Sequence, residues 1–498
     1  MNARPWILFL ALVSLQAQPR SNDPSAGSWR MIVLNSPTQV PVAEPLPVTD
    51  AAYQAELTAV KQAQSRITGD EREAVEYWSR GGVLRWNEIT MEMVAKANLP
   101  PAPRDDGTYV FPDANNPFAD PMFPFANPPY AARAYSYVAV VQYEALKVAW
   151  YYKYLYNRPS PATVDSGVQA LRASQGLPAY PSEDAVMAGA TAAILQLLFP
   201  TEVETIARRS AEQRQSALLA GRATPSDLNA GFALGQAVAN LVITRARTDG
   251  MGAAVGNAAL WQSLADQARA RGEIPWLSLE SPPRPPMLPL FGRVSAWSMT
   301  AADIAAERPG PPPSTSSAQM AREVAEVKDT LRRLTRRQMA IAYKWADGAG
   351  TPTPPGHWNY IAAPHIADAG FSEVRAARAL ALLNMAMHDA AVGCWDAKYA
   401  YFNPRPPQLD PSIRTPVGLP NFPAYTSGHS TFSAAAAEVL SYLFPASAAV
   451  FDADRDEASI SRLYAGIHYR SDIEVGKQHG QRIGAYTVRK AILDGADQ

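Results

Sequence analysis

The feature that most constrains this chain is an internal repeat in which residue n matches residue n + 245. The segment LPAYPSEDAVMAGATAAILQLLFP (177–200) aligns without gaps onto FPAYTSGHSTFSAAAAEVLSYLFP (422–445). At the same offset SALLAGRATPSD (216–227) lies on SRLYAGIHYRSD (461–472). Shared helical composition explains matched Ala and Leu, but not matched Pro, Phe-Pro, Ser-Asp and Gly in one register over about 90 residues. The repeat therefore predicts two structurally related helical bundles.

The periodicity of the chain indicates an all-α fold. Apolar residues recur at three- and four-residue spacing from near Ala51, and no segment shows sustained period-two alternation between hairpin turns. At 498 residues the chain is long for one core, which agrees with two packed four-helix bundles. We expect a signal peptide (1–17), an N-terminal arm and helices (18–129), a degenerate helical bundle (130–250), a Pro-rich connector with short helices (251–330) and a bundle that carries the functional site (331–498).

The first residues, MNARPWILFLALVSLQAQ, are typical of a secretory signal peptide with cleavage after Ala17. The apolar run is too short to span a bilayer, and no other segment reaches spanning length without polar breaks. We therefore expect an exported protein, periplasmic or extracellular, with no membrane span. The alternative interpretation of the apolar start is a buried N-terminal helix.

The charge and cysteine content exclude some functions. A formal net charge of −1 gives no long-range field, which argues against a nucleic-acid or membrane-surface partner. Any recognition of an anion must come from the local placement of cations. A single cysteine, Cys394, excludes an intramolecular disulfide.

Comparison of the two copies separates scaffold residues from residues of chemical interest. Shared positions are mostly packing and turn residues, whereas the positions unique to the second copy are basic or catalytic types. All six histidines also fall in the second half. The second copy has Arg405, Gly428, His429, Arg462 and His468 where the first has Ser160, Glu183, Asp184, Ala217 and Ala223. A structural role stays open for Lys398, Ser427 and Asp472, which are matched by Lys153, Ser182 and Asp227.

Three cations of the second copy, Lys398, Arg405 and Arg462, are expected to meet at one site. Cations drawn together repel by roughly 4 kcal/mol per close pair at an effective dielectric constant near 20. Leaving them desolvated and unpaired costs more. A multivalent anion between them removes this cost, and arginine side chains suit tetrahedral oxyanions.

The Ser427-Gly428-His429 turn precedes a predicted helix, STFSAAAAEVLSYLF. The N-terminus of a helix offers free N–H groups and a positive dipole end, and glycine lets the backbone approach a ligand. His468 and Asp472 are four residues apart, which we interpret as one helical face, so the carboxylate can bind one imidazole nitrogen and leave the other free. His429 is then the acid–base partner on the other side of the anion.

These residues form a three-part signature: Lys-x6-Arg-Pro, then Ser-Gly-His, then Ser-Arg-x5-His-x3-Asp. The combination resembles the signature of the type 2 phosphatidic acid phosphatase and vanadium-dependent haloperoxidase superfamily, in its chloroperoxidase-like branch. The likeness covers about 380–485 directly, and the degenerate copy extends it to about 130–245. One departure is Thr426 in place of the usual Pro, which the first copy keeps as Pro181. Threonine loosens the backbone preference of the turn but removes no donor.

The resemblance implies a vanadate cofactor, with phosphate competing for the same site. His468 would bind vanadium covalently and Asp472 would orient it, while His429 would be the acid–base residue that assists peroxide binding. Lys398 would also polarise bound peroxide. The residues expected to hold the vanadate oxygens are Lys398, Arg405, Ser427, Gly428 and Arg462.

Two aromatic residues, Trp395 and Phe422, match positions that shape the halide site in chloroperoxidase-like members. Ordinary aromatic core packing is the alternative for each. The absence of a predicted membrane span and the doubled bundle favour the haloperoxidase branch over its lipid phosphatases.

Three functions follow, in order of preference. The first is a vanadate-dependent haloperoxidase that uses hydrogen peroxide and halide to halogenate a small organic acceptor. The second is an acid phosphatase in which His468 attacks a phosphomonoester to give a phosphohistidine while His429 protonates the leaving group. The third is a non-catalytic oxyanion-binding protein, which the intact histidine pair disfavours because binding alone needs no acid–base residue.

Overall fold

The computed structural model describes residues 22–98, 105–106, 128–172, 176–280 and 283–497. Within these ranges the chain is helical and contains no strand, which confirms the all-α fold. The predicted signal peptide, 1–17, lies outside the described residues. None of the described helices combines the length and the apolar character needed to cross a membrane.

The helices of the two copies have matching bounds, each pair separated by 245 residues. Only the final helix differs, because it ends one residue before the matching position. Short 3-10 turns after Phe199 and Phe444 also match. The pairs are α4 (Pro128–Tyr156) with α14 (Glu373–Tyr401), α5 (Pro161–Val164) with α15 (Pro406–Leu409), α6 (Glu183–Leu198) with α16 (Gly428–Leu443), α7 (Val203–Leu219) with α17 (Ala448–Tyr464), and α8 (Pro225–Thr248) with α18 (Arg470–Ile492).

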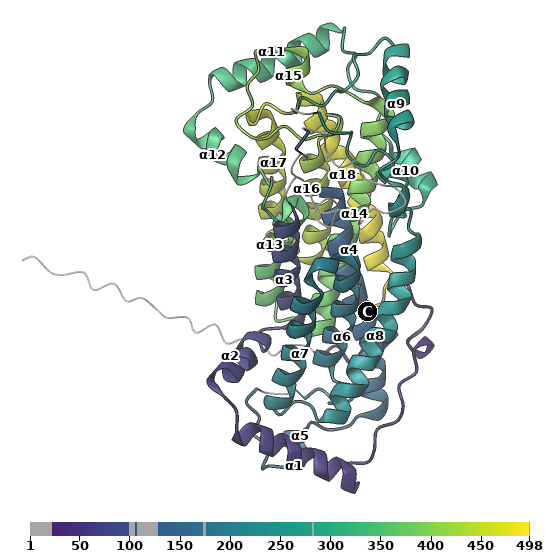
Figure 1. Cartoon of the computed structure of the whole chain (residues 1–498), viewed down its shortest axis with the longest axis vertical. Coiled ribbons are helices and arrows are strands. Elements are labelled where there is room, and N and C mark those ends of the chain that lie inside the picture. The colour runs from purple at the N-terminus through teal and green to yellow at the C-terminus, as the bar shows by residue number, and fades with distance from the viewer. Residues whose placement is uncertain (1–21, 99–104, 107–127, 173–175, 281–282, 498) are drawn as a thin grey trace, which may run out of the picture.

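The centre of the molecule is formed by α4 and α14, which pack against each other (Figure 1). Figure 1 shows α6, α7 and α8 on one side of this pair and α16, α17 and α18 on the other. Both central helices are buried over most of their circumference, so their buried charged side chains, such as Glu144 and Asp389, need partners within the protein. We call the helix set α4–α8 the first bundle and the set α14–α18 the second bundle.

Equivalent salt bridges connect the first helix of each bundle to a residue just after its last helix. Arg133 Nε lies 2.7 Å from Asp249 Oδ2 in the first bundle, and Arg378 Nε lies 2.7 Å from Asp494 Oδ2 in the second. Each of these arginines also donates to a carbonyl at the end of the last helix, of Ala246 in the first bundle and at the matching position in the second. The same sequence register therefore produces the same tertiary contacts.

Equivalent carboxylates of the central helices bind the segments that precede each bundle. Glu144 of α4 accepts hydrogen bonds from the N–H groups of 32–34, at 2.9, 3.0 and 2.9 Å. Asp389 of α14 accepts from the N–H groups of Trp297 and Ser298, both at 2.7 Å. Each carboxylate satisfies backbone donors that run over the helix surface, and so fixes the path of the arm and of the connector.

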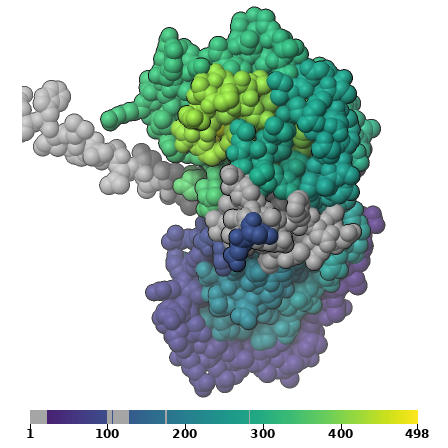
Figure 2. Space-filling model, turned by 45° about the horizontal axis from the view of Figure 1, so that its top comes forward, coloured from purple at the N-terminus to yellow at the C-terminus, as the bar shows by residue number. Residues whose placement is uncertain are grey.

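The remaining helices lie at the two ends and on the flanks of this core (Figure 1). Figure 2 shows one face on which the segment after α14, in yellow-green, is framed by the teal and green surface of 251–345. These helices are α1 (Ala51–Ser65), α2 (Gly69–Trp78), α3 (Gly82–Ala97), α9 (Ala258–Ala270), α10 (Ala301–Glu307), α11 (Ala318–Arg332), α12 (Arg336–Lys344) and α13 (Thr353–Asp368).

The turn before α16 keeps the conformation of its counterpart despite Thr426. The peptide bonds Tyr180–Pro181 and Tyr425–Thr426 are both cis. Ser182 and Ser427, the residues that follow, share φ of −64° and ψ of 121°, and each accepts a bond from the N–H three residues on. Threonine in place of proline therefore leaves the shape of this turn unchanged.

Candidate active site

The predicted site residues come from five elements of the second bundle and converge at its end. Ser427 is the N-cap of α16, and Gly428 and His429 open that helix. Lys398 lies in the last turn of α14 and Arg462 in the last turn of α17. The remaining three are Arg405 at the N-cap of α15, His468 between α17 and α18, and Asp472 in the first turn of α18.

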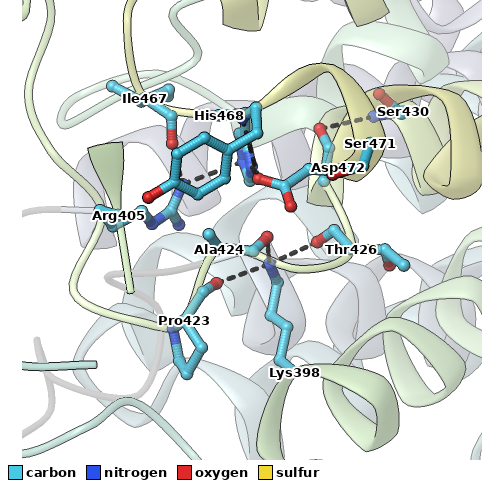
Figure 3. Close-up of polar contacts among 12 residues, drawn as sticks. Lys398, Arg405, Pro423, Ala424, Thr426, Ser430, Ile467, His468, Ser471 and Asp472 are labelled. Carbon is cyan, nitrogen blue, oxygen red and sulfur yellow. Dashed lines mark hydrogen bonds and ion pairs between the residues drawn. The ribbon is translucent and has the colours of Figure 1, made fainter. Parts of the chain in front are cut away.

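The Lys398 ammonium is buried and donates to three backbone carbonyls (Figure 3). Nζ lies 2.8 Å from the oxygens of Pro423 and Ala424 and 2.5 Å from that of Thr426. Burial lowers the pKa of Lys398 to about 7. Its three donors hold the segment before α16 against α14, so a direct contact with an oxyanion would replace one of these carbonyls.

Arg405 is buried and has one unused donor. Its Nε donates to the carbonyl of Phe422 at 3.0 Å, and its Nη1 lies 2.8 Å from the carbonyl of Ile467 and 3.0 Å from His468 Nε2. Nη2 has no hydrogen-bond partner among the described residues. Burial lowers the pKa of Arg405 to about 10. A buried guanidinium nitrogen without an acceptor is costly, and a bound anion would remove that cost.

Arg462 is 1% exposed and has only neutral partners. Its Nε donates to Ser461 Oγ at 2.8 Å and its Nη2 to the carbonyl of Ala342 at 3.0 Å. Burial lowers its pKa to about 10. In the part of the chain that the structure describes, no carboxylate lies within ion-pair distance of Lys398, Arg405 or Arg462.

The first bundle treats its cations differently. Lys153, the counterpart of Lys398, lies 2.7 Å from the carboxylate of Glu183. Arg222 pairs with the same carboxylate and lies 3.5 Å from Asp184. Burial raises the pKa of Glu183, but the charge of Lys153 and then that of Arg222 outweigh this effect and lower it to about 2. The first bundle thus carries its own anion, at the sequence position of Gly428.

Gly428 leaves space at the corresponding position of the second bundle. A Cβ atom added there would meet only the Phe432 ring, at 3.7 Å, so neither crowding nor backbone conformation requires glycine. The cavity beside it has a volume of about 240 Å³. Gly428, His429, Arg462 and His468 all line this cavity. Lys398, Arg405 and Ser427 lie behind this wall.

His468 is held between a carboxylate and a guanidinium (Figure 3). Nδ1 lies 2.9 Å from Asp472 Oδ2, and Nε2 faces Arg405. Because arginine can only donate and the carboxylate accepts, the proton belongs on Nδ1 and the lone pair on Nε2. Burial, then the charges of Arg405 and Lys398, hold the pKa of His468 well below its usual range.

The predicted geometry of this pair is wrong in one respect. His468 and Asp472 do not share a helical face, because α18 begins at Arg470 and His468 precedes it. Asp472 instead caps the helix, accepting from the N–H of Tyr469 at 3.1 Å. Asp227 accepts from the N–H of Thr224 in the same way, at 2.7 Å, so capping explains why both copies keep this aspartate.

His429 faces a carboxylate that the sequence analysis missed. Its Nε2 lies 3.5 Å from Asp347 Oδ2, and His357 Nδ1 lies 3.0 Å from Asp347 Oδ1. Burial, then the charge of Arg462, lowers the pKa of His429 to about 4. Asp347 lies in a loop outside the repeat and in no motif, so only its contact in space identifies it.

Trp395 and Phe422 line the cavity, with ring centroids 4.9 Å apart. The indole N–H of Trp395 donates to the carbonyl of Met287 at 3.2 Å. Trp150, its counterpart at the repeat offset, donates to the carbonyl of Asn22 at 2.9 Å. Fixing the preceding segment is therefore a role that this tryptophan has in both copies. Phe422 aligns with Leu177 in the repeat, so the phenylalanine is unique to the second copy.

Sequence comparison alone does not place this chain. No family model matches it, and no curated protein sequence matches it. Solved structures do. The crystal structure of the first bacterial vanadium-dependent iodoperoxidase matches with a TM-score of 0.56 at 22% identity, over 82% of this chain and 96% of that chain.

Two bacterial vanadium-dependent chloroperoxidase structures match as well. The apo form gives a TM-score of 0.51 at 14% identity, over 74% of this chain and 94% of that chain. The holo form gives 0.51 at 13% identity, over 79% and 96%. The arrangement of helices across most of the chain is therefore common to all of them. This protein has the fold of the vanadium-dependent haloperoxidases.

Proposed function

We propose that this protein is a vanadate-dependent haloperoxidase, which oxidises halide with hydrogen peroxide and so halogenates a small organic acceptor. One observation carries the proposal. Three buried cations, Lys398, Arg405 and Arg462, have no carboxylate within ion-pair distance among the described residues, and glycine stands at 428 where the first bundle has the carboxylate of Glu183 that pairs with Lys153. The fold, shared with bacterial vanadium-dependent iodo- and chloroperoxidases, supports the same function.

The donors present fit a vanadate ion. Arg405 has a buried Nη2 without a partner among the described residues, and Gly428 leaves the space that a side chain would fill. His468 presents an Nε2 lone pair, the kind of ligand that a metal centre binds. The residues that would hold the oxygens are Lys398, Arg405, Ser427, Gly428 and Arg462. Bound vanadate would supply a Lewis acid that makes peroxide electrophilic toward halide.

His429 is in the neutral form that a proton acceptor must have. Its Nε2 faces Asp347, which leaves Nδ1 for the cavity. With a pKa of about 4 the ring is neutral, so Nδ1 carries a lone pair. Hydrogen peroxide, halide and one proton give hypohalous acid and water. The site must therefore take a proton when peroxide binds and return it when the oxygen–oxygen bond breaks, and His429 would do both. The one proton that the overall reaction consumes comes from solvent.

The alternative activity is that of an acid phosphatase. A neutral His468 whose Nε2 carries the lone pair, beside the Arg405 guanidinium, is also an arrangement for attack on phosphorus, with His429 protonating the leaving group. Phosphate would then compete with vanadate for one pocket. We place halide oxidation first because of the fold and because Trp395 and Phe422 line the cavity as a halide site would require.

One experiment separates these functions. The purified protein is loaded with orthovanadate, and peroxide-dependent oxidation of iodide and bromide is measured beside hydrolysis of an aryl phosphate. Halide oxidation that requires vanadate supports the proposal. Hydrolysis that vanadate inhibits, without halide oxidation, assigns the phosphatase. His429→Ala is the control for mere binding: if it alters neither activity, the protein is an oxyanion binder.

The N-terminal segment supports a proposed location outside the cytoplasm, in the periplasm or the medium. Mass spectrometry of the N-terminus of the secreted protein tests this. Cleavage after Ala17 is the expected result, and an intact N-terminus in the cytoplasm contradicts it.

A further inference from the structure

Two histidines from different elements share the carboxylate of Asp347. His429, the first residue after Gly428 in α16, lies 3.5 Å from Oδ2, and His357 of α13 lies 3.0 Å from Oδ1. The side chains are 15%, 17% and 9% exposed for His429, His357 and Asp347. His357 Nδ1 is hydrogen-bonded to the carboxylate, whereas His429 Nε2 faces it at 3.5 Å without a hydrogen bond. Because a carboxylate is negative and only accepts, it favours the proton on the nitrogen that faces it in each ring.

The carboxylate cannot easily move away from either histidine. Asp347 has a left-handed backbone with φ of 44°, which is unfavourable for a residue with a side chain unless the loop around it is held. Asn98, at the end of α3, holds that loop by donating to the carbonyls of Gly348 and Thr351 at 2.9 and 3.0 Å. Burial would raise the pKa of Asp347, but the contacts with His357 and then His429 keep it well below the usual range.

His357 is itself fixed in one orientation. Its ring stacks on Trp345, with centroids 4.1 Å apart and an angle of 19° between the planes. The indole of Trp345 donates to Glu457 Oε1 of α17 at 3.0 Å. The stacked ring therefore points Nδ1 at Asp347, and a rigid chain runs from α17 through Trp345 and His357 to the carboxylate.

The histidines lie on opposite sides of this carboxylate. Asp347 and His429 line the cavity beside Gly428. Asp347 and His357 line a separate, wider groove of about 910 Å³ between α3 and α13. His357 therefore contacts Asp347 from outside the active-site cavity and has no route to a substrate there.

We propose that Asp347 and His357 are positioning residues that fix His429 with its proton on Nε2 and its lone pair on Nδ1, facing the cavity. His357 occupies Oδ1, so only Oδ2 is left for His429. Without His357 only the backbone of Asp347 is held, so the carboxylate can turn away from Nε2 and the His429 ring loses its defined tautomer and angle. The proposed tautomer is a property of the empty protein; its catalytic value rests on the proposed haloperoxidase function.

Two substitutions of His357 separate its two contacts. His357→Phe keeps a ring to stack on Trp345 but has no donor for Asp347. His357→Asn keeps a donor at the position of Nδ1 but loses the stacking. His365→Phe is the matched control, because His365 lies on the same helix, away from Asp347. Its ring lies 3.5 Å from Ser447 Oγ and packs on the rings of Phe444 and Phe451.

The first measurement is nitrogen-15 NMR of the histidine rings in protein without vanadate. The proposal predicts one His429 tautomer, protonated on Nε2, in the wild type, in His357→Asn and in His365→Phe. His357→Phe should show a mixture of tautomers. A single Nε2 tautomer retained in His357→Phe would overturn the proposal, as would an Nδ1-protonated ring in the wild type.

The second measurement is turnover of the vanadate-loaded enzyme. Loss of a residue that orients a site residue typically costs 10–100-fold, so kcat in His357→Phe should fall by about tenfold or more. The KM for halide and the affinity for vanadate should stay within about twofold, because no binding group is removed. His357→Asn should restore most of kcat. Equal kcat in His357→Phe and His365→Phe would contradict the positioning role. If the wild type oxidises no halide, the proposed haloperoxidase function fails, and the NMR result alone decides whether Asp347 and His357 position His429.

Discussion

The Glu183 carboxylate lies 2.7 Å from the Lys153 ammonium, at the positions that Gly428 and Lys398 have in the second bundle. The first bundle thus neutralises this buried lysine with a carboxylate of its own, and the second bundle has glycine at the matching position. Under the proposed function an anion from outside takes the place of that carboxylate.

Gly428→Glu should convert the second pocket into the state of the first. The new carboxylate would pair with Lys398, and the affinity for vanadate and phosphate should fall by at least about 100-fold, or roughly 2.7 kcal/mol. Isothermal titration calorimetry measures this. Gly428→Ala is the control, because its Cβ meets only Phe432, at 3.7 Å, and it adds no charge. Unchanged vanadate affinity in Gly428→Glu would show that the anion binds elsewhere.

Arg462→Ala and His468→Ala should remove oxyanion binding without unfolding the protein. The first bundle has alanine at both positions, Ala217 and Ala223, buried in the same fold. We expect the unfolding free energy without ligand to stay within about 1 kcal/mol and the vanadate affinity to fall by about 100-fold or more. Thermal denaturation with and without vanadate tests both parts. A vanadate-induced rise in Tm equal to that of the wild type would contradict the assignment.

The affinity for an oxyanion should fall as the pH rises above about 7. Burial lowers the pKa of Lys398 to about 7 in the empty site, and an anion favours the protonated ammonium. Binding above that pH takes up a proton, so affinity falls by up to about tenfold per pH unit and is level below it. Tungstate is a suitable probe because its charge is constant over this range. Lys398→Met should abolish the slope, whereas the exposed control Lys328→Met should keep it.

The protein should lose stability as the pH falls below about 6.5. Burial lowers the pKa of His388 and His479 to about 3, so the unfolded chain binds protons that the folded chain does not. Stability then decreases by up to about 1.4 kcal/mol per pH unit for each histidine, between about pH 6.5 and pH 3. His479→Leu should reduce the slope of unfolding free energy against pH, measured in urea. The same slope in His479→Leu as in the control His365→Leu would contradict this.

The fold could be predicted from the sequence because the two copies of the repeat align with each other at one constant offset. Once Phe-Pro, Ser-Asp and Gly matched at one offset, every helix of the second bundle had a counterpart. The structure reproduces that offset at the helix bounds. The resemblance of the signature led to the same fold that the solved structures share.

The contacts within the site could be predicted only in part. Comparison of the two copies identified Gly428 as different from its counterpart Glu183. It did not reveal that Asp472 caps a helix, because a four-residue spacing alone cannot distinguish two residues on one helical face from two residues at a helix N-terminus. Lys398 was expected to face the anion, and the structure shows its donors on three carbonyls. Asp347 could not be predicted as a site residue, because the tertiary fold alone brings it next to His429 and His357.

The packing of α4 on α14 has a consequence for how the two halves can be separated. Each central helix is buried nearly all round, and the other half covers part of its apolar surface. Cutting the chain between the bundles would expose that surface to water on both fragments, so neither half is an autonomous folding unit. Deleting the first half should therefore make the second half insoluble, although the proposed site lies entirely in the second.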